Sequence, residues 1–349
     1  MITLAQIGCG YWGPNLLRNF SARPDARVKY VVEASDERRR YVRNNHPFTQ
    51  AVPALETVLG DGAVQALVIA TPARTHFDLA LRGLNSGRHV FVEKPLAMSV
   101  GEVDQLAAVA GRQRLTLMVG HTFLYNPAVL VLKQIIDSGE LGAICYLYSQ
   151  RLNLGVVRSD VNALWNLAPH DISIFNFLLG GPPLAVTAHG TDYLRKGIED
   201  VVFAGLEYKD QVGASLHVSW LDPNKVRRVT LVGSRKMVVY DDIADHKLTI
   251  FDKGIDTVGN GSNPLPFDKA GMGQLVYRSG PSRHPEVPAV EPLQEEAAAF
   301  LTAIREGLPP RSDARCGRDV VAALQAASLS LKENSRRVSL GEIVTAPAS

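Results

Sequence analysis

Cysteine is scarce in this chain, and its spacing excludes two structural classes. The 349 residues include 3 cysteines, Cys9, Cys145 and Cys316, which lie far apart in the sequence. Widely separated single cysteines provide neither a disulfide framework nor the paired ligands of a structural zinc site. We therefore expect no disulfide, no metal site and a reducing compartment, which favours the cytoplasm.

Long apolar runs and a strong net charge are also missing. No apolar segment approaches the length that spans a bilayer, and the strand predicted over Ile2–Ile7 leaves no room for a leader peptide. The formal net charge is +2, and Arg38–Arg40 is only a short basic cluster. Such short clusters are typical of solvated faces. These absences predict a protein that binds neither membranes nor nucleic acids.

The chain does contain an ordinary globular composition and an alternating pattern in its first third. Hydrophobic residues make up 46% of the sequence and charged residues 21%, and this length suffices for two domains. Short β-rich runs alternate with helical patterns, which is typical of a doubly wound parallel sheet. Strands are predicted at ITLAQI, VKYVVE, ALVIAT, HVFVEK and LTLMVG, and helices at 14–20, 36–44, 75–86 and 100–111.

The pattern changes after about Gly120. A helix is predicted at 126–138, and a series of β-rich runs joined by short turns follows it. They predict a large mixed or antiparallel sheet, with a helix over 171–179 available to cover one face. The Gly- and Pro-rich region 253–292 is predicted to be a long loop, and two helices, 293–306 and 317–334, close the chain. We therefore expect an α+β domain at 122–349.

A glycine-rich turn follows the first predicted strand. Gly8-Cys-Gly-Tyr-Trp-Gly13 has the spacing G-x-G-x-x-G, and Pro14 after it suits the first turn of a helix. Glycines at this spacing let backbone N–H groups approach a pyrophosphate at the helix N-terminus. Glu33 stands about twenty positions further on, where a carboxylate binds both ribose hydroxyls and repels a 2′-phosphate. The pattern predicts a Rossmann domain at 1–121 that binds NAD rather than NADP.

Two further strands end in residues that suit a dinucleotide cleft. Thr71 and Pro72 follow one of them, and ligands of open α/β sheets lie outside the carboxyl ends of the strands. His76, just beyond, is either another cleft residue or a helix cap. Glu93-Lys-Pro95 follows the next strand, and Lys94 is either a cleft residue or a surface lysine with its stem packed on the sheet.

Together these motifs resemble the glucose–fructose oxidoreductase / inositol dehydrogenase / MocA family, abbreviated Gfo/Idh/MocA. The matching stretches are GCGYWG, ATPARTH, EKPLA, GHTFLYNP and the HDI that ends NALWNLAPHDI, and they span residues 8–172. The resemblance implies NAD(P) binding and the oxidation or reduction of a secondary alcohol or ketone on a sugar, cyclitol or nucleotide sugar. The stretches TFLYNPA and LAPHDIS are most similar to members that oxidise the 3-hydroxyl of UDP-N-acetylglucosamine in lipopolysaccharide assembly.

The resemblance also implies the catalytic residues. The family's EKP lysine falls on Lys94 and its histidine on His170, whereas Asn166 stands where the family commonly has aspartate. A neutral imidazole can accept the hydroxyl proton, and Lys94 would donate to the reacting oxygen. Asn166 can orient the substrate or the imidazole but cannot carry a proton. If the aspartate is needed to raise histidine basicity, this enzyme should be slower or work at higher pH.

The segment around His170 allows two local geometries. A helix capped by Asp160 and running to Leu179 would put Asn166 and His170 on one face, with Pro169 removing one backbone hydrogen bond. A helix that begins at Pro169 would instead place His170 in its first turn. The helix dipole there would favour the neutral imidazole.

Further residues are predicted around these sites. Asp171 is predicted to cap the start of a helix. Trp220 is predicted to belong to the core, with stacking on a sugar or base as the alternative, and Lys225 and Arg227 to be solvated surface, with diphosphate binding as the alternative. The cofactor-binding candidates are Gly8, Cys9, Gly10, Tyr11, Trp12, Gly13, Glu33, Thr71, Pro72, His76, Glu93, Lys94 and His121. The substrate-binding candidates are Tyr125, Arg151, Asn153, Arg158, Asn162, Trp165 and His170.

Three hypotheses for function follow. The first is an NAD-dependent oxidoreductase that oxidises a secondary hydroxyl of a sugar or nucleotide sugar to a ketone, with the 3-hydroxyl of UDP-N-acetylglucosamine as the leading substrate. The alternatives are an NAD-retaining glycoside hydrolase and a non-catalytic NAD-binding regulatory protein. One face of the second predicted sheet would also need covering, which predicts a homodimer or homotetramer.

Overall fold

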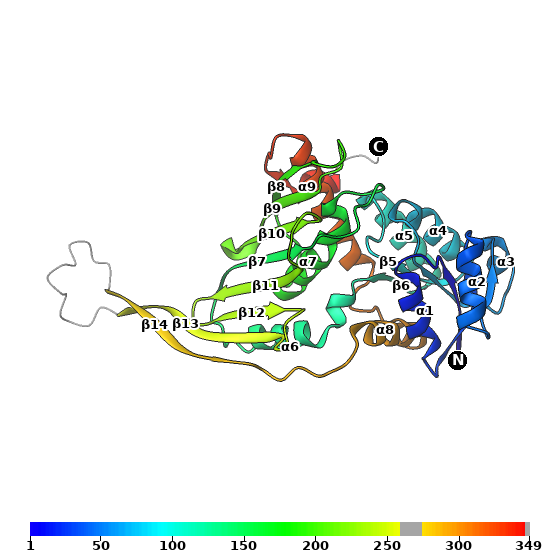
Figure 1. The fold of residues 1–349 in the computed structure, drawn as a ribbon, viewed down its shortest axis with the longest axis horizontal. Helices are drawn as coiled ribbons and strands as arrows, with labels where there is room; N and C mark the ends of the chain where they lie inside the picture. Colours follow the sequence, from blue (N-terminus) through cyan, green and yellow to red (C-terminus); the bar gives the residue numbers. More distant parts are fainter. Residues whose placement is uncertain (259–273, 346–349) are drawn as a thin grey trace.

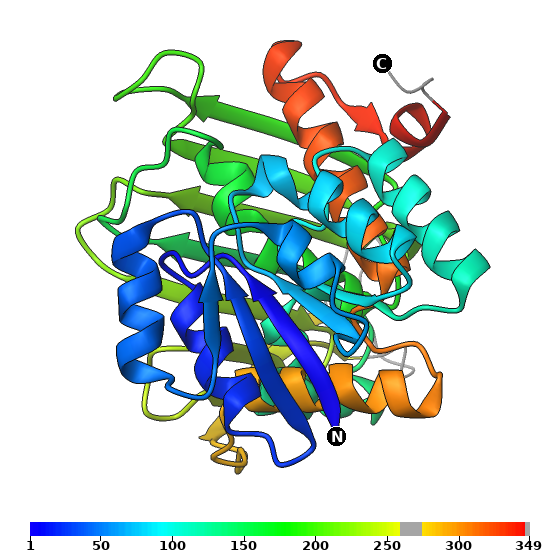
Figure 2. The same cartoon turned by 90° about the vertical axis from the view of Figure 1, so that its right-hand side faces the viewer.

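The chain forms two sheets that lie next to each other. The computed structural model describes residues 1–258 and 274–345. In Figure 1 a helix-covered sheet at the N-terminal end (blue to cyan) stands beside a larger sheet (green to yellow). Figure 2 looks onto the first sheet, with the second behind it. The predicted fold class, a Rossmann domain followed by an α+β domain with a large mixed sheet, is confirmed.

Six parallel strands make up the first sheet, in the order β3-β2-β1-β4-β5-β6. Every position of β4 and β6 is buried, which explains why these runs barely alternate in the sequence. The short edge strand β3 was not predicted, because it has only three residues, one exposed and two partly buried. The strands are β1 (Ile2–Ile7), β2 (Ala26–Val32), β3 (Gln50–Val52), β4 (Ala66–Ile69), β5 (His89–Glu93) and β6 (Leu117–Gly120).

The strand order reverses between β1 and β4, and such sheets bind ligands in the crevice outside the carboxyl ends of those strands. Four helices of this half begin within one residue of their predicted starts, and two short ones, at 55–59 and 73–75, were not predicted. They are α1 (Gly13–Ser21), α2 (Asp36–Asn45), α3 (Leu55–Leu59), η1 (Ala73–Thr75), α4 (His76–Asn85) and α5 (Val100–Gln113).

The second sheet has nine strands in the order β14-β13-β12-β11-β7-β10-β9-β8-β15. The pairing of β7 with β10 is parallel and the other pairings are antiparallel, so the sheet is mixed. The strands are β7 (Ile144–Leu152), β8 (Ala185–Thr191), β9 (Val201–Glu207), β10 (Gly213–Ser219), β11 (Val226–Gly233), β12 (Met237–Asp241), β13 (Leu248–Val258), β14 (Gln274–Arg283) and β15 (Val338–Ser339).

The prediction of a long loop over 253–292 is wrong for much of that region. β13 continues to Val258 and pairs with β14, and the two form an arm that extends away from the body of the sheet in Figure 1. Apolar periodicity is weak there because side chains such as Tyr277 are exposed instead of packed on a core. Part of the region, 259–273, lies outside the described residues.

The last helices return to the Rossmann domain. α8 packs against α1, where the rings of Phe20, Phe91 and Phe300 meet edge to face with centroids 5.7–6.2 Å apart. α9 lies between the domains and contacts α5, α7 and β8. The remaining helices are η2 (Thr122–Tyr125), α6 (Pro127–Asp137), α7 (Ala163–Leu179), η3 (Lys209–Gln211), α8 (Pro292–Glu306), α9 (Ala314–Lys332) and α10 (Leu340–Thr345).

Helix α7 settles the geometry around His170. It begins at Ala163, and its N-cap is Asn162, whose side chain accepts from the Trp165 N–H at 3.0 Å. Asp160 is therefore not the cap, although the longer of the two predicted helices is the one that forms. Asn166 and His170 are one turn apart on one face.

Along the described part of the chain, no helix combines the length and apolar character that crossing a bilayer requires.

Candidate active site

Two adjoining cavities follow the carboxyl edge of the six-stranded sheet. The larger has a volume of about 810 Å³ and the smaller about 620 Å³, and Gly10, Ala70, Thr71 and Pro72 line both. Glu33 lines the smaller cavity only, and Lys94 the larger only. The two cavities together suit an elongated ligand that crosses the switch point of the sheet.

The glycine turn is shaped for close approach of a ligand. Gly8 has φ +90°, and a Cβ atom there would stand 2.5 Å from the Ala70 carbonyl oxygen. A Cβ on Gly13 would lie 2.8 Å from the Gly8 oxygen, whereas one on Gly10 would meet nothing within 4 Å. Gly10 thus leaves open space where a pyrophosphate can reach the backbone. Buried Gln6, which sequence reasoning missed, braces the turn by donating to the Gly8 and Gly13 carbonyl oxygens.

Backbone hydrogen bonds hold the Glu33 carboxylate beside this turn. The N–H groups of Cys9 and Ser35 donate to its two oxygens at 2.8 and 2.9 Å. The Cys9 side chain faces the core, and burial raises the pKa of its thiol to about 11, so only its backbone takes part. Tyr11 and Trp12 line the larger cavity, and Tyr11 is largely exposed at its mouth.

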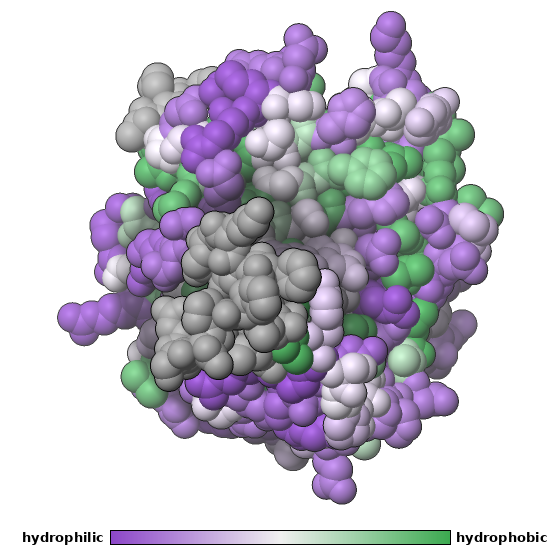
Figure 3. All heavy atoms as spheres, turned by 90° about the vertical axis from the view of Figure 1, so that its left-hand side faces the viewer, coloured by the Kyte–Doolittle hydropathy of each residue, from purple (hydrophilic) through white to green (hydrophobic). Residues whose placement is uncertain are grey.

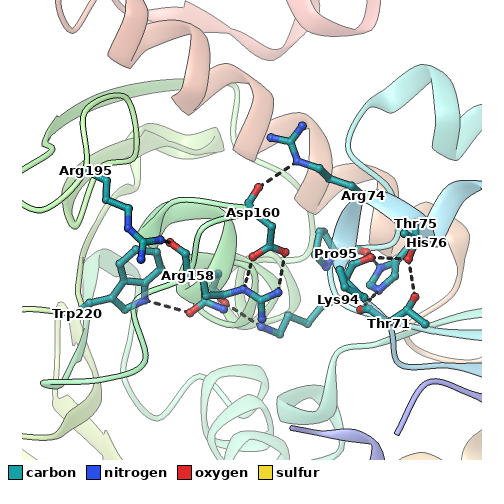
Figure 4. Close-up of polar contacts among 12 residues, drawn as sticks. Thr71, Arg74, Thr75, His76, Lys94, Pro95, Arg158, Asp160, Arg195 and Trp220 are labelled. Carbon is teal, nitrogen blue, oxygen red and sulfur yellow. Dashed lines mark hydrogen bonds and ion pairs between the residues drawn. The ribbon is translucent and has the colours of Figure 1, made fainter. Parts of the chain in front are cut away.

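His76 joins the two turns that line the cleft. Its ring nitrogens lie 2.7 Å from the Pro95 carbonyl oxygen and 2.9 Å from that of Thr71, as Figure 4 shows. The residue is 1% exposed and lines neither cavity, and the N-cap of α4 is Thr75. Neither predicted role applies, because the imidazole is used to hold the two turns together.

Lys94 connects the two domains. Its Nζ donates to the backbone oxygen of Asn166 on α7 at 2.8 Å. Burial lowers the pKa of this ammonium to about 8; the Glu93 charge opposes the shift, and Arg158 adds to it. The alternative of a surface lysine is wrong, since the side chain lies in the larger cavity.

The orientation of the Asn166 amide follows from its neighbour. The Trp220 indole N–H donates to Asn166 Oδ1 at 3.1 Å. An indole nitrogen can only donate, so the atom facing it must be the amide oxygen. The Nδ2 group is therefore left to donate to a ligand in the larger cavity, which Asn166 lines.

His170 lines the same cavity one turn beyond Asn166. Its Nδ1 is buried and has no hydrogen-bond partner within the described part of the chain. Because a ligand in the cavity cannot reach that buried nitrogen, Nε2 is the ring nitrogen available to it. Burial lowers the pKa of this imidazole well below its usual value, and the charges of Lys94 and Arg151 lower it further. The ring is therefore neutral at physiological pH and can accept a proton.

Asp171 is an ion-pair partner and not a helix cap. Arg151 donates to its two oxygens at 2.8 and 3.1 Å, and both side chains are almost fully buried. The capping prediction fails because α7 starts at Ala163, which puts Asp171 in the helix interior. The Arg151 guanidinium also lies over the Phe123 ring, 4.6 Å from its centroid.

A loop from the second domain borders the cavity. Asn153 and Arg158 line it, and Arg158 forms a two-point ion pair with Asp160 at 2.8 and 2.7 Å. Arg74 of the Rossmann domain donates to the Asp160 carbonyl oxygen at 3.1 Å (Figure 4). This contact fixes the loop against the first domain.

Besides Cys9, Gly13 and His76, four predicted residues line neither cavity. The Tyr125 hydroxyl bonds with Ser312, Asn162 caps α7, and the Trp165 indole donates to Ser328. Their polar groups are occupied by structural bonds. His121 is 1% exposed, and burial lowers its pKa to about 3.

The far wall of the larger cavity contains polar residues that were missed or misjudged. Arg227 lines it, contrary to the prediction of solvated surface, together with Asn126 and Asp242. Tyr240 links the last two by accepting from Asn126 and donating to Asp242. Glu291, at the start of α8, completes the wall. Arg227 was considered from the sequence as a possible diphosphate contact, but the other positions carried no signal there, because only the fold brings such distant residues together.

The Rossmann sheet, its open glycine turn and a polar cavity beside it define an NAD(P)-dependent oxidoreductase. In the described residues no cluster of histidine, cysteine and carboxylate side chains is suited to hold a metal ion. The profile of the GFO_IDH_MocA oxidoreductase family, with an NAD-binding Rossmann fold, matches residues 2–121, and the family's C-terminal domain profile matches 129–239. The chain belongs to the Gfo/Idh/MocA family of oxidoreductases, which act on sugar hydroxyls.

Individual relatives agree with this assignment. The chain is 28% identical over 275 residues to UDP-N-acetylglucosamine 3-dehydrogenase of Acidithiobacillus ferrooxidans, covering 78% of this chain and 80% of that protein. It is 23% identical to the NAD⁺-dependent scyllo-inositol 2-dehydrogenase of Bacillus subtilis, over 74% of this chain and 80% of the relative. Levoglucosan dehydrogenase with NADH and levoglucosan has the same fold, with a TM-score of 0.81 at 20% identity, covering 97% of this chain and 99% of the other.

The position of Glu33 predicts the choice of cofactor. We expect Glu33→Ser to weaken NAD binding roughly 10- to 100-fold, because charge-assisted bonds to the ribose hydroxyls are lost. We expect the wild type to prefer NAD over NADP and this substitution to reduce the preference. Dissociation constants for both nucleotides, measured by calorimetry, check this.

Glu56→Gln is the matched control, because Glu56 lines the same cavity but its carboxylate pairs with Arg82. It should leave both constants nearly unchanged. Equal effects of the two substitutions would mean that overall charge, and not a ribose contact, sets the preference.

Proposed function

We propose that this protein uses NAD to oxidise a secondary hydroxyl of a sugar or nucleotide sugar to a ketone. The observation that carries the proposal is the hydrogen bond from Lys94 Nζ to the Asn166 carbonyl. It brings an ammonium from the Rossmann domain to the helix that holds His170, at one cavity beside the glycine turn. His170 as proton acceptor, with Lys94 and Asn166 as hydrogen-bond donors, can thus reach one hydroxyl of a substrate.

Each residue of the cavity has a separate role in the proposed oxidation. The bound nicotinamide would supply the hydride acceptor. His170, held neutral by burial, takes the hydroxyl proton at Nε2. Lys94 Nζ and Asn166 Nδ2 donate to the same oxygen and stabilise its developing negative charge. Arg151, already paired with Asp171, keeps the imidazole neutral through its charge.

The leading substrate in this proposal is UDP-N-acetylglucosamine, oxidised at its 3-hydroxyl. The similarity to a dehydrogenase of that nucleotide sugar supports it. The cavity wall supports it as well, since the guanidinium groups of Arg158 and Arg227 are partly exposed there and suit a diphosphate. Each guanidinium already pairs with a carboxylate, Arg158 with Asp160 and Arg227 with Asp242, and a diphosphate would add a second anionic partner that a free sugar lacks.

A substrate panel tests the proposal. We expect NADH absorbance to rise when protein and NAD meet UDP-N-acetylglucosamine, and to rise less with N-acetylglucosamine or scyllo-inositol. Lys94→Met should lower kcat by roughly 100- to 1000-fold and leave NAD affinity nearly intact, because the donor to the oxygen is lost.

Lys133→Met, at a partly exposed lysine that pairs with Asp137 and lines neither cavity, is the control and should retain activity. Absence of turnover across the panel, despite NAD binding, would count against the proposal. Release of nitrophenol from aryl glycosides without net NADH would favour a hydrolase instead. Tightly bound nucleotide with neither reaction would favour a regulatory protein.

The amide at position 166 predicts a distinctive pH profile. With a Lys94 pKa of about 8, kcat/KM should fall as pH rises above that value and the ammonium loses its proton. In Asn166→Asp a carboxylate beside Lys94 and His170 raises the pKa of both groups. We expect both limbs of the profile to move up by about one to two pH units.

Asn153→Asp introduces the same charge elsewhere in the cavity and is the matched control. Its basic limb should shift less than that of Asn166→Asp. A basic limb that stays in place in Asn166→Asp would mean that Lys94 is not the group titrating.

We also propose that the open face of the nine-stranded sheet binds a second copy of the chain. The helices α7 and α9 pack on the opposite face. Tyr148 and Phe203 point outward between buried neighbours, and Tyr146 is exposed next to buried Leu147. Figure 3 shows apolar side chains (green) among hydrophilic ones on this side. Apolar surface of this kind is typical of contacts between copies.

Tyr146→Glu combined with Phe203→Glu should convert the dimer or tetramer to a monomer, because two charges would be buried at the interface. Light scattering after gel filtration measures the mass. Lys209→Glu, on the turn between β9 and β10, is the control. A wild-type protein that is already monomeric would overturn this part of the proposal.

A further inference from the structure

Two buried carboxyl groups, one lining the larger cavity and one beside it, are not used in the catalytic scheme. Glu93, the last residue of β5, is 8% exposed and lines the cavity, while Glu296 of α8 is 0% exposed. Glu93 Oε2 accepts from the Lys94 backbone N–H at 3.2 Å, and Glu296 Oε2 accepts from the Thr122 hydroxyl at 2.8 Å. In each group the second oxygen is buried without a hydrogen-bond partner in the described portion of the chain.

The groups packed around Glu93 oppose one another in their effect on its charge. Lys94 is the cation that faces it, Glu296 faces it from α8, and the Trp12 indole approaches from the glycine turn. On β6, Gly120 gives it room, since a Cβ there would stand 3.2 Å from Oε1. Two neighbouring carboxyl groups that are shielded from water repel each other when both are ionised, so ionising the second costs free energy.

Burial has the same effect on both groups. It raises the pKa of Glu93 to about 7, against the opposing charge of Lys94. Burial and the Glu93 charge raise the pKa of Glu296 well above its usual value. A small change in nearby charge can therefore change the proton content of the pair at neutral pH.

We propose that the Glu93–Glu296 pair holds more bound protons beside a reduced nicotinamide than beside an oxidised one. Glu93 lines the cavity at the end of the cleft away from Glu33, where the nicotinamide half of a dinucleotide belongs. The oxidised ring is a cation and favours an ionised carboxylate, whereas the reduced ring is neutral. The pair thus compensates the charge of the ring. This inference rests on the dinucleotide binding of the proposed function and is independent of the sugar.

Proton-linked binding tests the proposal. NAD⁺ and NADH are titrated into the full-length protein at pH 7 by calorimetry, in phosphate and in Tris, which differ in their heat of ionisation. We expect NAD⁺ binding to release a fraction of a proton and NADH binding to release less or take one up. The ratio of the two dissociation constants should change with pH, by up to about tenfold per pH unit.

Variants identify the source of the proton. Glu93→Gln should abolish the difference between the nucleotides, and Asp319→Asn, a half-buried carboxyl of α9 that lines neither cavity, should preserve it. Glu296→Gln removes the neighbouring charge without touching the cavity, so the pKa of Glu93 should fall and proton release should move to lower pH. Lys94→Met should retain the release.

The outcomes separate the inference from the proposed function. Equal proton counts for NAD⁺ and NADH in the wild type would overturn the inference alone. A difference that persists in Glu93→Gln but disappears in Lys94→Met would also overturn it, because the lysine would then be the source. Failure of either nucleotide to bind would overturn the proposed function itself.

Discussion

The hydrogen bond from the Lys94 ammonium to the Asn166 carbonyl joins the two halves of the molecule at the cavity where we propose that the chemistry takes place. β5 ends at Glu93, so Lys94 leaves the sheet at the edge where the dinucleotide cleft runs. A buried ammonium needs hydrogen-bond acceptors, and α7 provides one. Because His170 is one turn further along α7, the contact that places the lysine also brings it to the imidazole.

The charges around His170 are controlled by ion pairing and by a neutral side chain at position 166. Arg151 is satisfied by Asp171 yet still lowers the pKa of His170. Asn166 adds a donor without adding a charge, since Trp220 occupies its oxygen. A carboxylate in its place would hold protons on both Lys94 and His170. The neutral amide therefore favours an unprotonated His170 and a Lys94 with a lowered pKa in the same cavity.

The features that sequence analysis predicted are those with local causes. The glycine turn is readable because φ +90° at Gly8 and the close approach of Ala70 exclude side chains there. Asp171 was misread because its role depends on where α7 begins, and the helix starts at Ala163 and not near Pro169. The β13–β14 arm was missed because exposed strands lack the alternation that packing on a core imposes.

By itself the sequence determined the alternation of strands and helices, the nucleotide-binding turn and the residue types available for proton transfer, because each depends on neighbours close along the chain. The tertiary structure alone decided which side chains share the cavity. Arg227 and Glu291 reach it through sheet order and helix packing, while Tyr125 and Trp165 are drawn away by bonds to Ser312 and Ser328. Such partners are far apart in sequence, and only the packing of α8 and α9 against both domains brings them into contact.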